Sequence, residues 1–262
     1  MSFDDVCIIL NGYAHDAEQL NHVVKSYGAM GFNNIVVSSY QDSIPDKFFN
    51  QPAVILNDDT LRSPLKEVCH PPGMSEKCVV NYQINTINKG IVMANYTYGT
   101  LAKYYFRCRA DILVEDLDKC VERWRQEVTI SRNQDEVFRS KIVQLAWSTK
   151  RKRQWYVYDY WAFGLKEDIN SYYNINFLDR DPYPELWNST STQEIYDVGG
   201  GPITEQYLAS AHILSVRSDI SWPEARERYF IFDKNLKAFW YKYDKHITCD
   251  SMNGRTGRDF LQ

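Results

Sequence analysis

Three short apolar runs near the N-terminus each end in small polar residues, and this pattern constrains the fold more than any other feature. The runs cover residues 5–10, 35–37 and 53–56. Runs of this length, bounded by turn-forming residues, are typical of buried strands. Residues 16–30 carry apolar side chains at helical spacing, and Asp16 stands where a helix cap is expected. This order predicts an α/β fold in which a mostly parallel sheet is flanked by helices.

The pattern continues along the rest of the chain. It predicts helices over about 77–98 and 204–215 and a strand over 104–109. The C-terminal half is expected to be more irregular and rich in aromatic residues. Tyr occurs 19 times, and we assign most of these rings to the core, with stacking on a sugar or a base as the alternative. Because no repeat or low-complexity tract divides the chain, we expect a single domain over residues 1–262.

Overall charge and missing motifs exclude several function classes. The formal net charge is −4, whereas a general nucleic-acid binder needs a basic surface. Neither a P-loop nor a G-x-G-x-x-G run is present, so an ATPase or a dehydrogenase lacks its signature. The His residues are scattered and no C-x-x-C pair occurs, which argues against a zinc site.

The cysteines and the charge runs bear on the compartment. Six Cys residues follow an N-terminus without a signal-peptide pattern, and no apolar run approaches the roughly 18 residues of a membrane span. We therefore expect free thiols and a cytoplasmic protein. The basic run at residues 150–153 is expected to be a solvated loop. Peripheral contact with anionic lipid headgroups at the inner membrane face, or with an anionic glycan, is the alternative.

Polar residues stand at the ends of the three predicted strands. In open α/β sheets, ligands bind beyond the carboxyl ends of the strands. These residues are therefore expected to line one edge and to hold a nucleoside, with Tyr13 or Tyr40 stacked on the base. Spacing alone favours ordinary polar loops over such a site. The candidate residues are Asn11, Gly12, Ser38, Ser39, Tyr40, Asp58 and Asp59.

A sharper pattern, Arg109-Ala110-Asp111, follows the strand predicted over 104–109. An acid just past a buried strand can ligate a divalent cation, which neutralises a pyrophosphate. Arg107 and Arg109 share one face of this strand, and either can contact phosphate bidentately. A simple ion pair between Arg109 and Asp111 is the alternative.

Several segments, in their order along the chain, resemble the WavE lipopolysaccharide-synthesis family. The main matches are NYQINTINKGIVMA at 81–94 and YFRCRADI at 105–112. The segments at 8–12, 36–40, 55–59, 159–164 and 202–208 are similar to other elements of the family. Three departures occur: Ser39 replaces a more frequent Thr, Asp59-Thr60 replaces Asp-Pro, and Ile203-Thr204 is inserted before Glu205.

This resemblance implies a hexosyl- or pentosyltransferase with a GT-A-like, Rossmann-type fold. Such an enzyme would transfer sugar from a nucleotide-diphosphate sugar to a growing surface glycan (lipopolysaccharide, capsule or a related polysaccharide), with a glycan or lipid-linked glycan as acceptor. Residues 1–115 would then bind the nucleotide sugar, and residues 116–262 would face the acceptor.

Roles for single residues follow from the same interpretation. Asp111 would hold Mn²⁺ or Mg²⁺, or a hydroxyl of the donor sugar, close to the bound diphosphate. Asn81 and Gln83 would contact the donor or the loop that carries Asp111. Glu205, at the start of a predicted helix, is favoured over Asp159 as the catalytic base.

Two other functions remain open. One is a non-catalytic protein of the same fold that binds carbohydrate or nucleotide. The other is a metal-dependent hydrolase of nucleotide sugars, which would release sugar without an acceptor.

Overall fold

The structure is a computed structural model. It describes residues 2–12, 14, 16–40, 54–57, 80–132, 135–145, 155, 157, 159–176 and 204–248. Seven strands of this part form one sheet with the order β3-β2-β1-β4-β7-β6-β8. Its strands are β1 (Val6–Asn11), β2 (Asn34–Tyr40), β3 (Val54–Asn57), β4 (Tyr104–Arg109), β6 (Ile142–Leu145), β7 (Trp161–Leu165) and β8 (Phe230–Asp233).

The directions of these strands confirm the predicted α/β class. All neighbouring pairs are parallel except those of β7, which runs antiparallel to β4 and to β6. The sheet is therefore mostly parallel. It also takes strands from both halves of the chain, so residues 1–115 and 116–262 contribute to one layer.

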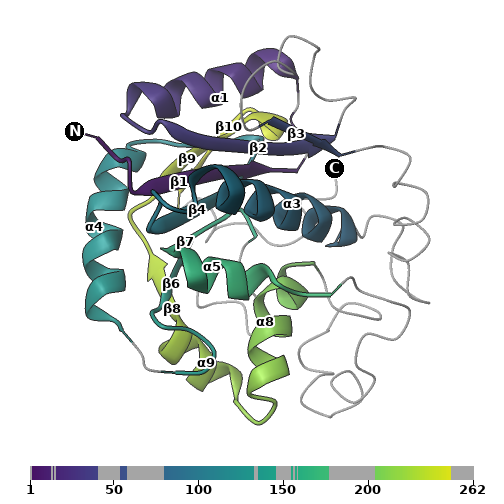
Figure 1. Cartoon of the computed structure of the whole chain (residues 1–262), viewed down its shortest axis with the longest axis vertical. Coiled ribbons are helices and arrows are strands. Elements are labelled where there is room, and N and C mark those ends of the chain that lie inside the picture. The colour runs from purple at the N-terminus through teal and green to yellow at the C-terminus, as the bar shows by residue number, and fades with distance from the viewer. Residues whose placement is uncertain are drawn as a thin grey trace.

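Helices cover both faces of this sheet (Figure 1). One face carries α1 (Ala17–Ala29) and α4 (Leu117–Ile130). The other carries α3 (Val80–Tyr98), α5 (Lys166–Tyr173), α8 (Thr204–Val216) and α9 (Trp222–Tyr229). Asp16 caps α1 as expected, because its carboxylate accepts a 2.7 Å hydrogen bond from the Gln19 N–H. The described helices include none that is both long and apolar enough to cross a membrane.

Alternation along β1 divides the core into two parts. Ile8 and Leu10 pack toward α1 and α4, whereas Cys7 and Ile9 pack toward α3 and α5. A strand whose residues are buried on both faces reads as a continuous apolar run, which explains the pattern of residues 5–10.

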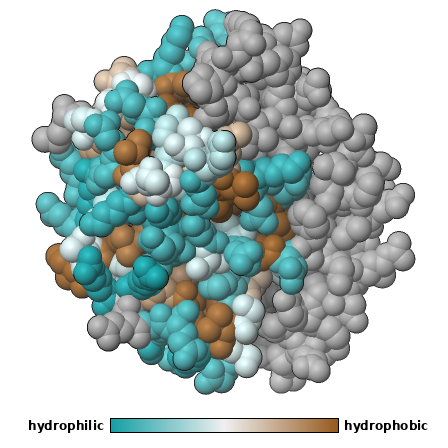
Figure 2. Space-filling model, in the orientation of Figure 1, coloured by the Kyte–Doolittle hydropathy of each residue, from teal (hydrophilic) through white to brown (hydrophobic). Residues whose placement is uncertain are grey.

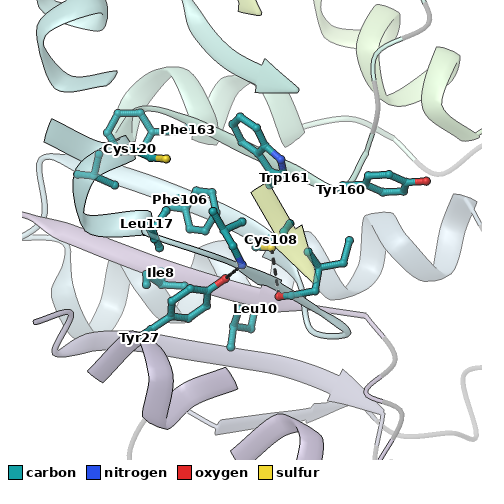
Figure 3. Close-up of a cluster of buried hydrophobic side chains, with 14 of the residues drawn as sticks. Ile8, Leu10, Tyr27, Phe106, Cys108, Leu117, Cys120, Tyr160, Trp161 and Phe163 are labelled. Atoms are coloured by element: carbon teal, nitrogen blue, oxygen red, sulfur yellow. Dashed lines mark hydrogen bonds between the residues drawn. The ribbon is translucent and has the colours of Figure 1, made fainter. Parts of the chain in front are cut away.

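The core beneath α1 and α4 is aromatic (Figure 3). Trp124 of α4 stacks on Trp161 of β7 with ring centroids 4.8 Å apart. The Tyr27 hydroxyl accepts a 3.0 Å hydrogen bond from the Val114 N–H, and burial raises the pKa of this hydroxyl well above its usual value. Most rings described here therefore serve the core, as the composition analysis expected.

The three cysteines in the described part of the chain are free and buried, one on the α3 face of the sheet and two beneath α1 and α4. They are Cys7, Cys108 and Cys120. Burial raises the pKa of the Cys7 and Cys108 thiols to about 12 and that of Cys120 to about 11. These thiols are therefore held in the protonated, unreactive form.

On the opposite face, Gly90 lets α3 approach the sheet closely. A Cβ atom at this position would lie 2.7 Å from Ile9 Cγ2 and 3.3 Å from Ser38 Cβ. Only glycine fits without displacement of the buried strands β1 and β2. This contact places the first turns of α3 above the carboxyl end of β1.

A second, smaller sheet is attached to the end of β4. Its antiparallel strands are β5 (Ile112–Val114), β9 (Lys237–Trp240) and β10 (Lys245–Thr248), in the order β10-β9-β5. The chain leaves the large sheet at Arg109 and enters the small one at Ile112, so residues 104–114 form two strands rather than one. The short 3-10 helix η4 (Tyr241–Tyr243) follows β9.

Candidate functional site

The carboxyl ends of β1, β2 and β4 meet at one edge of the large sheet. In register, Asn11 lies beside Ser38 on one side and beside Arg109 on the other. Gly12 follows with a φ of +89° and donates a 3.1 Å backbone hydrogen bond to the Ser38 carbonyl. The positive φ explains why glycine stands at this turn. The expected convergence of these strand ends is present.

Not all of these residues face outward. The side chains of Asn11, Ser38 and Ser39 are at most 1% exposed. Asn11 is held within the protein by side-chain hydrogen bonds, and both serines have partners of their own. They support the edge from beneath, and Gly12 remains half-buried above them.

For several other predicted site residues, the residue or its side chain lies outside the described part of the chain. Tyr13, Asp58, Asp59, the basic run 150–153 and the glycines 199–201 lie outside the described residues. Tyr40 ends β2 and Asn81 lies in the first turn of α3, but the structure describes neither side chain. Their binding roles stay predictions.

Arg109 and Asp111 form an ion pair, which was the alternative to a metal or phosphate site at these residues. Arg109 Nε donates to Asp111 Oδ1 and Nη2 donates to Oδ2, both at 2.9 Å. Trp240 of the small sheet donates a third bond of 2.9 Å to Oδ2. The Asp111 side chain is only 4% exposed, whereas that of Arg109 is 23% exposed.

The electrostatics of this pair fix the charge of Arg109. Burial alone would lower the pKa of its guanidinium, but the charge of Asp111 and its hydrogen bonds raise the pKa above the usual value. The guanidinium also lies over the rings of Tyr160 at 5.8 Å and Trp240 at 5.4 Å. Arg109 is therefore a permanently charged group in a rigid setting at the edge.

The described residues do not fit a divalent cation at Asp111. Both of its oxygens already accept protein hydrogen bonds. Within the described residues, no group of three or more His, Cys, Asp or Glu side chains is arranged to hold a metal ion. The metal-binding role of Asp111 stays a prediction.

Arg107 lies deeper on the same face of β4 and is completely buried. Its Nε donates a 2.5 Å hydrogen bond to Asn11 Oδ1, and Asn11 Nδ2 donates at 3.2 Å to Thr86 of α3. Nη1 donates to the Asp159 carbonyl, and the Tyr173 ring lies 5.4 Å from the guanidinium. Arg107 therefore ties β4 to β1 and to the chain before β7, away from the exposed edge that Arg109 occupies.

Several buried polar atoms around this face lack a hydrogen-bond partner among the described residues. Most buried polar atoms in proteins have one, so each exception calls for a reason. The atoms are Gln83 Oε1, Arg107 Nη2, Gln144 Oε1 and Asp159 Oδ2.

Glu205 lies in the first turn of α8, as predicted, and is half-buried with a partner inside the protein. The following residues Tyr207 and Leu208 pack with Ile84 of α3 in a small separate cluster. The structure thus brings the first turns of α8 and α3 together, although they are far apart in the sequence. The role of Glu205 as a base stays a prediction.

Sequence reasoning missed three residues of this region. Thr86 stands one turn after Gln83 in α3, so helical spacing alone marks it as a neighbour. Trp240 and Gln144 have no local signal, because strand pairings between distant segments bring them here.

Comparison with known proteins adds no relative: no family model matches the chain, and no curated protein matches its sequence. The resemblance to the WavE family therefore stays a prediction.

Proposed function

We propose that the chain is a glycosyltransferase with a GT-A-like fold that transfers sugar from a nucleotide-diphosphate sugar. One observation carries the proposal: Arg109 presents a charged, part-exposed guanidinium where the carboxyl ends of β1 and β4 adjoin. A guanidinium has five N–H donors, and Asp111 takes two of them. The others are available to a diphosphate at the edge where α/β sheets bind ligands.

In this mechanism Arg109 stabilises the negative charge that develops on the departing nucleoside diphosphate. Asp111 and Trp240 act on Arg109 rather than on the substrate. Asp111 holds the guanidinium in one orientation before the ligand arrives, and Trp240 fixes Asp111 by donating to its Oδ2, so no ordering is needed at the moment of transfer.

The acceptor hydroxyl must lose a proton as it attacks the sugar. Glu205 is the proposed base, supported by the packing of α8 against α3 beside this edge. Asp159 is the alternative base. The nucleoside would rest against Gly12, with further contacts from Tyr40, Asp58, Asp59, Asn81 and Gln83.

The acceptor is proposed to be a surface glycan under assembly, free or lipid-linked. The basic run at residues 150–153 would allow peripheral contact with an anionic membrane surface.

In the view of Figure 2, apolar residues on the described surface are interspersed among hydrophilic ones.

A second candidate is a non-catalytic protein of the same fold that binds nucleotide or carbohydrate. The engagement of both Asp111 oxygens by Arg109 and Trp240 favours it, because this carboxylate then serves structure.

A two-stage experiment tests the proposal. Thermal shifts are first measured with UDP, GDP, CDP and ADP, with and without Mn²⁺, since a ligand of the folded state raises the melting temperature. The matching sugar nucleotides are then incubated with glycan acceptors, and released nucleotide is measured. Acceptor-dependent release supports transfer, and acceptor-independent release indicates a hydrolase. Binding without release indicates the non-catalytic protein, and no shift with any nucleotide contradicts the proposal.

A further inference from the structure

A row of side chains crosses the large sheet beside Arg107. In register, Ile9 of β1 pairs with Arg107, Arg107 with Ala162 of β7, Ala162 with Gln144 of β6, and Gln144 with Phe232 of β8. Residues opposite one another in a sheet share a face. Arg107 and Gln144 therefore stand on the same face, with their Cα atoms about 10 Å apart at two strand spacings. Between them the sheet carries only the methyl group of Ala162.

Asp159 completes this group, which we call the Arg107 cluster (Arg107, Gln144 and Asp159). The guanidinium donates to the backbone carbonyl of Asp159, so the two residues are adjacent. All three side chains are deeply buried: Arg107 is 0% exposed, Gln144 1% and Asp159 5%.

Each member of the cluster keeps one buried polar atom without a hydrogen-bond partner in the described structure. These atoms are Arg107 Nη2, Gln144 Oε1 and Asp159 Oδ2. A buried charge that lacks part of its hydrogen bonding is costly, and two charged groups and an amide share this deficit. A ligand within reach of all three would meet this deficit.

The charges define the chemistry of that partner. Arg107 is a cation and Asp159 an anion, so a neutral ligand satisfies both, whereas a phosphate would meet the Asp159 carboxylate. One group must accept from the guanidinium and another must donate to the carboxylate. A hydroxyl group does both, and a sugar ring carries hydroxyls on adjacent carbons.

We propose that the Arg107 cluster binds hydroxyl groups of the transferred sugar. This inference rests on the proposed function and names the sugar-recognition residues of that same site. Its placement agrees with Arg109 as the diphosphate ligand. Arg107 and Arg109 are two residues apart on one face of β4, about 6.6 Å along the strand. Sugar and diphosphate would therefore bind in neighbouring positions.

The test uses two substitutions in the full chain, Asp159→Asn and Gln144→Leu. Asp168→Asn is the matched control, because Asp168 is also a buried carboxylate but lies beyond the other end of β7. Thermal melting first establishes that each variant is folded. Binding of UDP, GDP and their glucose, galactose, N-acetylglucosamine and mannose conjugates is then measured by calorimetry. Contact with the four free monosaccharides is measured by ligand-detected NMR.

The wild type is expected to bind at least one sugar nucleotide about tenfold more tightly than its nucleoside diphosphate. Asp159→Asn and Gln144→Leu should each remove most of this difference and leave the affinity for the diphosphate unchanged. Free monosaccharide contact should disappear in both variants and persist in Asp168→Asn.

Three results overturn the inference. The first is a nucleoside diphosphate that binds while its sugar adds no affinity in the wild type. The second is a sugar contribution or monosaccharide contact that survives both substitutions. The third is no sugar contact in any arm, which leaves ordered water as the partner of the cluster. Monosaccharide contact that depends on Asp159, without binding of any nucleotide, would keep the sugar site and refute the proposed transferase.

Discussion

The carboxyl and amino ends of the strands in the large sheet, called here its carboxyl edge and its amino edge, carry the same residue types in different roles. Strand β7 joins them: its first residue, Trp161, pairs with Cys108 near the carboxyl end of β4, and its last, Leu165, pairs with Tyr104 at the amino end. At each end stand a part-exposed arginine and a buried aspartate that is not its ion-pair partner. Arg109 and Asp159 belong to the carboxyl edge, and Arg125 and Asp168 to the amino edge.

At the amino edge these groups hold neighbouring segments of the protein together. Arg125 pairs with Asp5, is 24% exposed, and lies over the rings of Phe3 at 5.1 Å and Tyr104 at 5.7 Å. Both carboxylate oxygens of Asp168 accept backbone N–H groups of the segment before β6, at 2.7 and 2.9 Å. Only Arg125 Nε, of the described polar atoms in this group, is buried without a partner.

At the carboxyl edge, residues of the same types keep polar atoms that have no hydrogen-bond partner among the described residues. Arg109 matches Arg125 in exposure, in its carboxylate partner and in its two rings. Beneath it, however, the Arg107 cluster retains an unpaired donor and two unpaired acceptors. Burial and residue type therefore do not distinguish the proposed binding end from the amino end. The two ends differ in how many of their described buried polar atoms lack a hydrogen-bond partner.

The largest effect is expected when the two arginines are compared directly. Arg109→Gln should reduce sugar transfer by about 100-fold or more, the usual loss when a donor to developing charge is removed. Arg125→Gln should change transfer by less than about twofold once folded protein is equal, because Arg125 lies at the opposite, amino end of the strands, beside Asp5. Steady-state rates of nucleotide release provide the measurement. Equal losses in both variants would erase the distinction between the edges.

A smaller effect concerns the packing of α3 against the sheet, which holds Thr86 over Asn11. Gly90→Val should lower the free energy of unfolding by about 2 kcal/mol, because its side chain would overlap Ile9 and Ser38. In Gly28→Ala, on α1, the added Cβ has nothing within 4 Å. This control should stabilise by at most about 1 kcal/mol. Urea unfolding measures both, and a neutral Gly90→Val would contradict the close contact.

A third effect is the pH dependence that Asp168 contributes to stability. Burial raises the pKa of its carboxyl to about 6, although the two backbone N–H groups oppose the shift. Between about pH 4 and pH 6 the folded state therefore holds more protons than the unfolded state, and the free energy of unfolding falls as pH rises. This contribution is present below about pH 4 and lost above about pH 6.

Asp168→Asn removes this titration. The difference in unfolding free energy, wild type minus variant, should decrease from pH 4 to pH 6 and stay constant at higher pH. Denaturant unfolding at several pH values measures it. A difference that is flat across this range would show that the carboxyl titrates normally.

The sequence predicted the parts of this arrangement that depend on local pattern. The apolar runs marked β1, β2 and β3, the spacing after Asp16 marked α1, and the residues after the runs marked one edge. The order of β7, β6 and β8 was out of reach, because it depends on pairing between distant segments. For the same reason Arg107, interpreted from its strand position as a phosphate contact, lies in the interior beside Ala162 and Gln144. The role of Trp240 is likewise set by the pairing of β9 with β5.

The hydrogen bond from Trp240 to Asp111 has a consequence for biosynthesis. The ribosome completes β1 and β4 long before it reaches the segment that supplies this indole. Until residues 237–248 have emerged and docked, Asp111 lacks one of its three hydrogen bonds, and Arg109 has only one of its two flanking rings. A nascent chain can thus assemble most of the central layer while Arg109 is still incompletely braced, so the proposed phosphate-binding arginine would reach its final setting only after this late segment has docked.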